Sequence, residues 1–219
     1  MDINKPLYLF LTSGACTRKT FTTKAIFQVL IRIYDAYFIV YPLKPKGLIL
    51  AFTGKVAYNA GGTTIHSALL IPFNKSSFLP LSNEMLDTLG KLYQELRVVL
   101  IDEASLIGSC FLYCIDDRLR NIKHAQTKYF GNIDMIFCGD LYQAQPIQDS
   151  LIFEQPTMNK QVITYEFWKE NVKCYELHTT MRQTNEKFIS TLNRIQQIIK
   201  QRMIWHILIE IVFDMHLMT

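Results

Sequence analysis

Short apolar runs recur along the chain, and each one ends in polar residues that can carry chemistry. Four runs span residues 7–11, 48–52, 97–101 and 133–138, and a fifth strand candidate spans residues 172–177. Continuous apolar runs of this length are typical of strands buried on both faces of a parallel sheet. The segments between them are long enough to hold helices that cross from one strand to the next. The pattern predicts an α/β fold with a mostly parallel central sheet flanked by helices.

Three of the connecting segments show the spacing of amphipathic helices. The first begins at Lys19, and its apolar positions are Phe21, Ala25, Val29 and Ile33 at four-residue steps, beside Ile26 with Leu30 and Phe27 with Tyr34. The second spans residues 84–96 and the third residues 106–122. In the third we expect the charged side chains to point mostly outward, namely Asp116, Asp117, Arg118 and Arg120.

The polar residues that follow the runs suggest a common site. They lie at 18–20, 53–55, 102–103, 140–143 and 182. Open parallel α/β sheets bind ligands outside the carboxyl ends of their strands. We therefore expect these clusters to converge on one crevice, and their chemistry favours nucleotide hydrolysis.

The turn after the first run has features of a phosphate-binding loop. Such loops follow the pattern GxxxxGK[ST], in which free backbone N–H groups and a helix N-terminus hold the phosphates. Lys19 and Thr20 match it and Gly14 lies inside it, but Ser13 and Arg18 stand at the two glycine positions. A side chain forced into the left-handed conformation costs roughly 1–2 kcal/mol, although the Arg18 charge could also attract phosphate. Taken alone, the loop fits nucleotide binding and an ordinary strand-turn-helix equally well.

Two further features can be interpreted in more than one way. Asp102 and Glu103 are adjacent carboxylates at the end of a buried run, where unpartnered charges are costly. In a phosphate-loop protein Asp102 would hold Mg²⁺ and Glu103 would take a proton from water, whereas the alternative is a solvated strand end. His66 follows a glycine and threonine turn, and its spacing alone favours a loop or helix-cap role.

Composition sets limits on the class of protein. The chain has 219 residues, 49% of them hydrophobic and 19% charged, with a formal net charge of +4. These values indicate a globular fold that can bury a core, and they permit a nucleic-acid partner without requiring one. No run reaches the ~20 apolar residues of a membrane span. The polar start lacks a signal-peptide core.

The five cysteines do not form a recognisable motif. Cys110 and Cys114 lie one helical turn apart, which allows a metal or redox pair, but no histidine has ligand spacing. Buried thiols in a reducing compartment are the favoured interpretation. The full set is Cys16, Cys110, Cys114, Cys138 and Cys174.

Several stretches in order resemble the first motor domain of the superfamily-one DNA helicases of the petite-integration-frequency type, including relatives carried by Helitron transposons. The stretches are SGACTRKTF, TGKVAYNAGGTTIHS, VVLIDEASLIGS, FCGDLYQAQPI and LHTTMRQ followed by LNRI. The resemblance covers about residues 6–196 and implies a RecA-like phosphate-loop NTPase domain. It also implies an ATP-dependent DNA helicase with ATP, Mg²⁺ and single-stranded DNA as its partners, acting in DNA repair, recombination and telomere maintenance in the nucleus or mitochondrion.

The resemblance also implies roles for single residues. Lys19 would contact the terminal phosphates, Thr20 and Asp102 would hold the Mg²⁺, and Glu103 would be the catalytic base. Gln143 would sense the γ-phosphate and Arg182 would neutralise charge on the transferred phosphoryl group. The rest of the loop would bind nucleotide through Gly14, Cys16, Thr17 and Arg18. The residues implied to line the DNA track are Thr53, Gly54, Lys55, Thr64 and His66.

The chain also departs from the family pattern. Beyond Ser13 and Arg18, Phe52 stands where a proline is usual, and Ala144-Gln145 replaces Leu-Pro. We expect residues 1–196 to form the first motor lobe and residues 197–219 an atypical helical tail, without a second lobe. The alternative function is an inactive, transposon-derived module that binds single-stranded DNA or a protein partner. A small-molecule kinase is a third possibility, for which no lid or acceptor pocket is evident.

Overall fold

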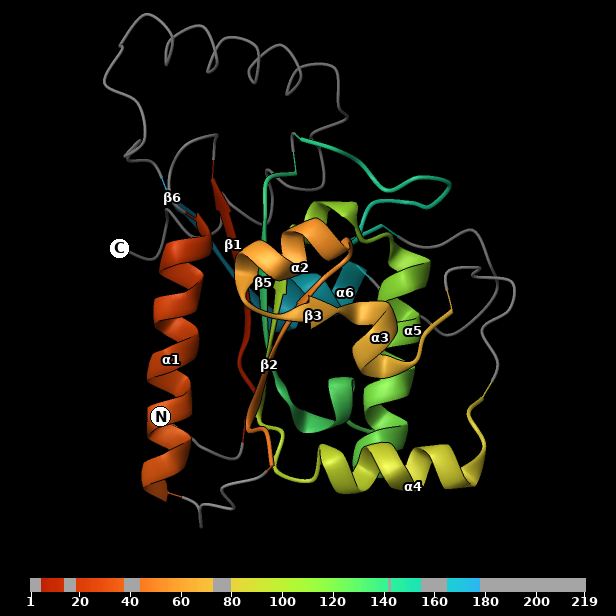
Figure 1. Ribbon diagram of the computed structural model, residues 1–219. Helices are drawn as coiled ribbons and strands as arrows, with labels where there is room; N and C mark the ends of the chain where they lie inside the picture. The colour runs from red at the N-terminus through yellow and green to blue at the C-terminus, as the bar shows by residue number, and fades with distance from the viewer. Residues whose placement is uncertain are drawn as a thin grey trace, which may run out of the picture.

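Six parallel strands form the central sheet of the computed structural model, which describes residues 5–13, 19–37, 44–72, 80–141, 143–154 and 165–177. The strand order is β3-β2-β4-β5-β1-β6 (Figure 1). The strands are β1 (Tyr8–Ser13), β2 (Gly47–Ala51), β3 (Thr63–Thr64), β4 (Val98–Asp102), β5 (Asp134–Gly139) and β6 (Val172–Leu177). The predicted α/β class is confirmed, and the four apolar runs and the fifth strand candidate all form strands. The two-residue β3 was not predicted because it is too short to show a pattern.

Helices connect the strands on both faces. They are α1 (Lys19–Tyr37), α2 (Gly54–Ala60), α3 (Ile65–Leu69), α4 (Asn83–Leu92), α5 (Ser109–Lys123) and α6 (Tyr165–Asn171). Two short 3-10 turns, η2 (Ala104–Leu106) and η3 (Tyr129–Asn132), complete the described elements. The predicted helices at 84–96 and 106–122 correspond to α4 and α5, each with a shifted end.

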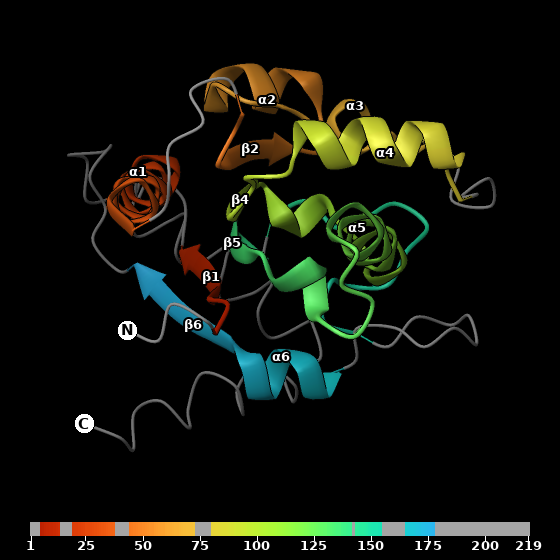
Figure 2. The ribbon, with the colours of Figure 1, turned by 90° about the horizontal axis from the view of Figure 1, so that it is seen from below.

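The two faces of the sheet are covered unequally. On one face α1 packs Phe27 and Leu30 against Leu9 of β1, with Val98, Leu100 and Ile136 in the same cluster. On the other face α3, α4, α5 and α6 contribute to a larger core with Phe130 and Phe137 at its centre. Figure 2 shows α1 on one side of β1 and the stack of α4 and α5 on the other. This layering leaves the ends of the strands open for a site.

The face of α1 that packs on the sheet belongs to one of the two sets of apolar positions that the sequence shows on this helix. Thr23, Phe27 and Leu30 are buried, whereas Phe21 is 71% exposed and Val29 is 54% exposed. The four-residue repeat beginning at Phe21 therefore points away from the sheet. The helix contains two apolar stripes, and periodicity alone could not tell which one meets the strands.

Two charged residues of α5 are inside the protein, contrary to the prediction. Asp116 and Arg118 are buried at 4% and 2% exposure. The Asp116 carboxylate accepts a hydrogen bond from the Phe130 N–H at 2.6 Å and pairs with Arg120 at 2.7 Å. Burial of a carboxylate is tolerated where hydrogen bonds and an ion pair compensate it.

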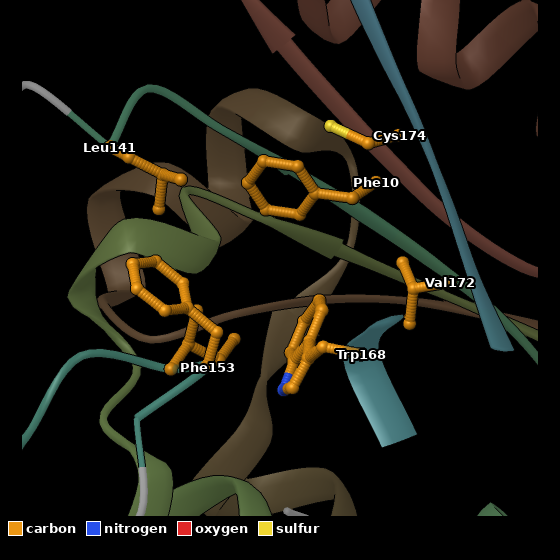
Figure 3. Close-up of a pocket in the computed structure, with 7 residues that line it drawn as sticks. Phe10, Leu141, Phe153, Trp168, Val172 and Cys174 are labelled. Atoms are coloured by element: carbon orange, nitrogen blue, oxygen red, sulfur yellow. The ribbon is translucent and has the colours of Figure 1, made fainter. Parts of the chain in front are cut away.

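A small apolar pocket lies beside the edge of the sheet (Figure 3). Phe10 of β1, Phe153 of the segment after β5 and Trp168 of α6 point toward one another there. The remaining lining residues are Leu141, Ile152, Val172 and Cys174. The pocket shows that the segment after β5 is anchored to the core by apolar side chains at both of its ends.

The described cysteines agree with the expectation of buried thiols. Cys114, Cys138 and Cys174 are buried thiols, and Cys110 is half-buried. Burial raises the pKa of the Cys138 thiol to about 12, which keeps it protonated. Within the described part of the chain, the helices are too short or too polar to span a bilayer.

Candidate nucleotide-binding site

The carboxyl ends of the strands meet at one edge of the sheet, as the polar clusters predicted. The register pairs Ala51 with Asp102, Asp102 with Cys138, and Thr12 with Gly139. The ends of β1, β2, β4 and β5 therefore lie at nearly the same level along the sheet. This is the edge at which parallel α/β sheets bind ligands.

Lys19 is the cation of the site and begins α1. Its Nζ donates a hydrogen bond to the main-chain oxygen of Ser13 at 2.8 Å and lies 3.8 Å from a carboxylate oxygen of Asp140. The Lys19 side chain is 16% exposed and that of Asp140 is fully buried. The ammonium group is thus held between the end of β1 and the end of β5. There it can meet an anion at the N-terminus of α1.

Thr20 and Asp102 supply oxygen atoms next to this cation. The Thr20 hydroxyl donates to Asp102 Oδ2 at 3.2 Å, and the Glu103 N–H donates to Asp102 Oδ1 at 3.0 Å. Mg²⁺ prefers oxygen ligands and is usually bound by one or two carboxylates together with substrate phosphates. The hydroxyl and the carboxylate fit that requirement. Among the described residues no group of three or more His, Cys, Asp and Glu could hold a metal, so the phosphates would have to complete such a site.

Glu103 has an unusual backbone and a perturbed carboxyl group. It lies in the left-handed region with φ of 52° and ψ of 48°, between β4 and η2. Burial raises the pKa of its carboxyl group, as does the charge of Asp102, while Lys19 lowers it. A carboxylate with a raised pKa and a strained backbone at the mouth of a site is a candidate for proton transfer.

Gln143 lies in the loop that follows β5. Its N–H donates to the carbonyl of Asp140 at 3.0 Å, and its side chain is exposed. The backbone of Gln143 is therefore tied to the residue that faces Lys19. The four other predicted nucleotide contacts, Gly14, Cys16, Thr17 and Arg18, and the predicted Arg182 lie outside the described residues.

The segment after β2 carries the residues that were predicted to meet DNA. Thr53 caps α2 by accepting a hydrogen bond from the Val56 N–H, and Thr64 caps α3 by accepting one from the Ser67 N–H. Thr53, Gly54 and Lys55 are exposed, and Thr64 is half-buried. Their local role is to begin two short helices, and this leaves the Lys55 side chain on the surface.

His66 lies beneath this surface and is 7% exposed. Its Nδ1 is 2.8 Å from the carbonyl oxygen of Ile71, and its ring packs 5.5 Å from Phe52 and 5.0 Å from Phe111 between centroids. These contacts give His66 a packing role. Contact of His66 with DNA stays a prediction.

Asp140 is the residue of the site to which the sequence interpretation assigned no role. It belongs to the polar cluster at 140–143, but only Gln143 received one. The signal was its place directly after β5, where an acidic side chain at a strand end faces the Lys19 ammonium group. The contact holds the Lys19 ammonium group beside the end of β5.

The fold and the grouped lysine, hydroxyl and carboxylates define a RecA-like phosphate-loop NTPase domain. A family model described as PIF1-like helicase matches residues 2–207. The ATP-dependent DNA helicase PIF1 of Saccharomyces cerevisiae is 30% identical over 86% of this chain and 21% of its own length. The chain therefore belongs to the PIF1-like helicase family.

Solved structures agree with this assignment. Bacteroides Pif1 bound to single-stranded DNA superposes with a TM-score of 0.65 at 26% identity, covering 87% of this chain and 42% of that one. Bacteroides Pif1 in complex with ADP-AlF3 and single-stranded DNA gives a TM-score of 0.62 at 26% identity, covering 90% and 43%. The chain spans about a fifth of the length of the curated relatives it matches.

Proposed function

We propose that this chain is the ATP-binding lobe of a DNA helicase, in which ATP hydrolysis is coupled to movement along single-stranded DNA and to unwinding. The observation that carries the proposal is the meeting of Lys19, Thr20, Asp102 and Asp140 at the carboxyl ends of β1, β4 and β5. The relatives support it, since the PIF1 proteins are named ATP-dependent DNA helicases.

In this proposal each residue has a role that follows from its charge and its position. Lys19 leaves Asp140 and binds the terminal phosphates, and Thr20 with Asp102 holds Mg²⁺, which would neutralise phosphate charge. Glu103 accepts a proton from the attacking water. Gln143 senses the γ-phosphate, and Arg182 neutralises charge on the transferred group.

The DNA strand is assigned to the surface formed by Thr53, Gly54, Lys55 and Thr64. Thr53, Gly54 and Lys55 follow β2, Thr64 ends β3, and β2 pairs with both β3 and β4 in the sheet. Hydroxyls, backbone N–H groups and a lysine are suited to phosphate-backbone contact, which is tolerant of base sequence. His66 would support this surface from below through Phe52 and Phe111.

A second candidate function follows from the phosphate loop. Ser13 and Arg18 occupy positions where the pattern has glycine, which favours an inactive module that binds single-stranded DNA or a protein partner. ATP turnover should be measured with Mg²⁺ and single-stranded DNA for the wild type, Lys19→Ala and Arg18→Gly. Turnover by the wild type that Lys19→Ala abolishes supports the helicase lobe. Turnover only in Arg18→Gly supports the inactive module.

The control for Lys19→Ala is Lys24→Ala on the same helix. Lys24 donates to the carbonyl of Asn59 at 3.3 Å and lies outside the site. Its loss should leave turnover unchanged. Equal loss in both variants would show that turnover depends on α1 lysines in general, and it would argue against a phosphate-specific role for Lys19.

A further inference from the structure

Asp149 joins the segment that carries Glu103 to the segment that carries Gln143. Its Oδ1 accepts hydrogen bonds from the N–H groups of Cys110 at 3.2 Å and Ser150 at 2.9 Å, and its Oδ2 accepts one from Phe111 at 3.3 Å. Helices leave their first N–H groups without partners inside the helix. The N-terminus of α5 thus receives its side-chain cap from a residue 39 positions later in the chain.

The local sequence makes room for this distant cap. Gly108 precedes α5 and makes no side-chain cap of its own. A Cβ at Gly108 would lie 2.0 Å from the Cγ of Asp149, so only glycine lets the carboxyl group approach. The Ser109 N–H also donates to the Ser150 carbonyl at 3.1 Å. The two segments are therefore joined by one backbone hydrogen bond and by two hydrogen bonds from backbone N–H groups to the Asp149 carboxylate.

A second contact joins the same segments closer to the sheet. A Cβ at Gly139 would lie 3.0 Å from the backbone nitrogen of Ser105 and 3.1 Å from that of Ala104. The turn after Glu103 is consequently packed against the end of β5. Gln143 lies between Gly139 and Asp149 in sequence, so its loop is attached to the Glu103 segment on both sides.

The loop of Gln143 is also held from the core. Leu141, Ile152 and Phe153 line the apolar pocket beside Phe10 and Trp168 (Figure 3). These side chains pack the loop against the core, and the hydrogen bonds of Asp149 join it to the N-terminus of α5.

We propose that Asp149 is a positioning residue for nucleotide hydrolysis, which it serves by holding the loops of Glu103 and Gln143 in a fixed relation through the N-terminus of α5. This inference rests on the proposed function of the site. Small displacements of groups that meet the same reacting atoms are costly for rate, so a residue that prevents them affects turnover without touching substrate.

The test compares Asp149→Ala with Asp116→Ala. Asp116 is a matched control because its carboxylate also accepts a buried backbone N–H, that of Phe130, and because it lies on α5 outside the two loops. Both variants should lose stability. Asp149→Ala should lower the kcat of DNA-stimulated ATP hydrolysis by roughly 10-fold or more, with KM for ATP changed by less than about twofold, whereas Asp116→Ala should keep kcat.

Amide hydrogen exchange, measured without nucleotide, tests the contact between Asp149 and α5 independently of turnover. In Asp149→Ala, exchange should rise at Cys110 and Phe111 and also across residues 103–108 and 140–148. If the wild type shows no turnover, the proposed function fails, while this exchange pattern still decides whether Asp149 couples the loops. Where Asp149→Ala does not fold, Asp149→Asn keeps the size and one acceptor oxygen and should show a smaller loss.

Two results would overturn the inference. Equal effects of Asp149→Ala and Asp116→Ala on kcat would show that Asp149 acts only as a stabilising helix cap. An exchange increase confined to the first turn of α5 would show that the two loops are not coupled through it.

Discussion

Thr20 and Asp102 are joined by a hydrogen bond of 3.2 Å although 82 residues separate them in the chain. The first belongs to the start of α1 and the second is the last residue of β4. This contact links the phosphate loop to the acidic pair, which the sequence could only place at separate strand ends.

Thr20→Val should lower the apparent affinity of the proposed site for Mg²⁺. The change removes the hydroxyl and keeps the branched shape, and we expect the Mg²⁺ concentration for half-maximal turnover to rise roughly 10-fold or more. Titration of Mg²⁺ in the ATP assay measures it. Thr23→Val is the control, because its hydroxyl donates to the carbonyls of Lys19 and Thr20 within α1. A similar rise in both variants would contradict a metal role for Thr20.

Glu103→Gln should stop turnover while nucleotide still binds. The amide cannot accept the proton from water, so kcat should fall at least ~100-fold. Affinity for a labelled ATP analogue should change only a few-fold, because Lys19 and Thr20 are intact. Glu84→Gln, at an exposed position in the first turn of α4, is the matched control and should turn over normally. Substantial residual turnover in Glu103→Gln would assign the base elsewhere.

Lys55→Ala should weaken binding of all single strands alike. Lys55 is exposed at the start of α2, where its charge would meet phosphate rather than bases. Anisotropy titrations with several labelled oligonucleotides should show the same loss for each. The slope of log affinity against log salt should shrink by about one. Lys91→Ala on α4 should change neither quantity, and a loss confined to certain sequences would argue against backbone contact.

Asp134→Asn should make stability less dependent on pH. The buried Asp134 carboxylate accepts hydrogen bonds from the Leu7 N–H and the Tyr34 hydroxyl, and burial raises its pKa. The folded state therefore holds the proton more tightly than the unfolded state. Stability should fall as pH rises through the window between the ordinary pKa of Asp and the raised one.

Urea unfolding between about pH 4 and pH 7 checks this expectation. The free energy of unfolding should fall less steeply with pH in Asp134→Asn than in the wild type. Asp116, whose pKa burial also raises, should account for part of the remaining slope. An unchanged slope would mean that Asp134 titrates alike in both states.

Gly62→Ala should destabilise the fold, whereas Gly54→Ala should not. A Cβ at Gly62 would lie 2.0 Å from the carbonyl oxygen of Ile49, and one at Gly54 would meet no atom within 4 Å. The expected loss for Gly62→Ala is about 1–3 kcal/mol in the free energy of unfolding. Gly54→Ala should be neutral or stabilise by up to ~1 kcal/mol, since alanine favours helix. Thermal melting of both variants would measure the contrast.

The sequence predicted the sheet well because its strands are buried and continuous. The runs ending near Asp102 and Gly139 became β4 and β5, and their polar ends met as expected. The sequence did not predict which face of α1 packs inward, because the helix carries two apolar stripes and the choice between Phe21 and Phe27 depends on the sheet. The burial of Asp116 was not predicted, because the N–H group that donates to its carboxylate belongs to Phe130, in a later turn of the chain.

Contacts between distant segments explain the features that the sequence did not predict. Asp149 caps α5 from 39 residues away, and helix-cap patterns in sequence are local. The burial of His66 depends on Phe52 and Phe111, which come from different elements. Such relations follow from packing, which periodicity does not encode.

The register of β2 against β4 connects the two ends of the site. Ala51 of β2 and Asp102 of β4 are paired in the ladder. The residues that lead to Lys55 follow β2 and the acidic pair begins at the end of β4, so one hydrogen-bonded pair of strands holds both. The proposed nucleotide site and the proposed DNA surface therefore share this one hydrogen-bonded ladder.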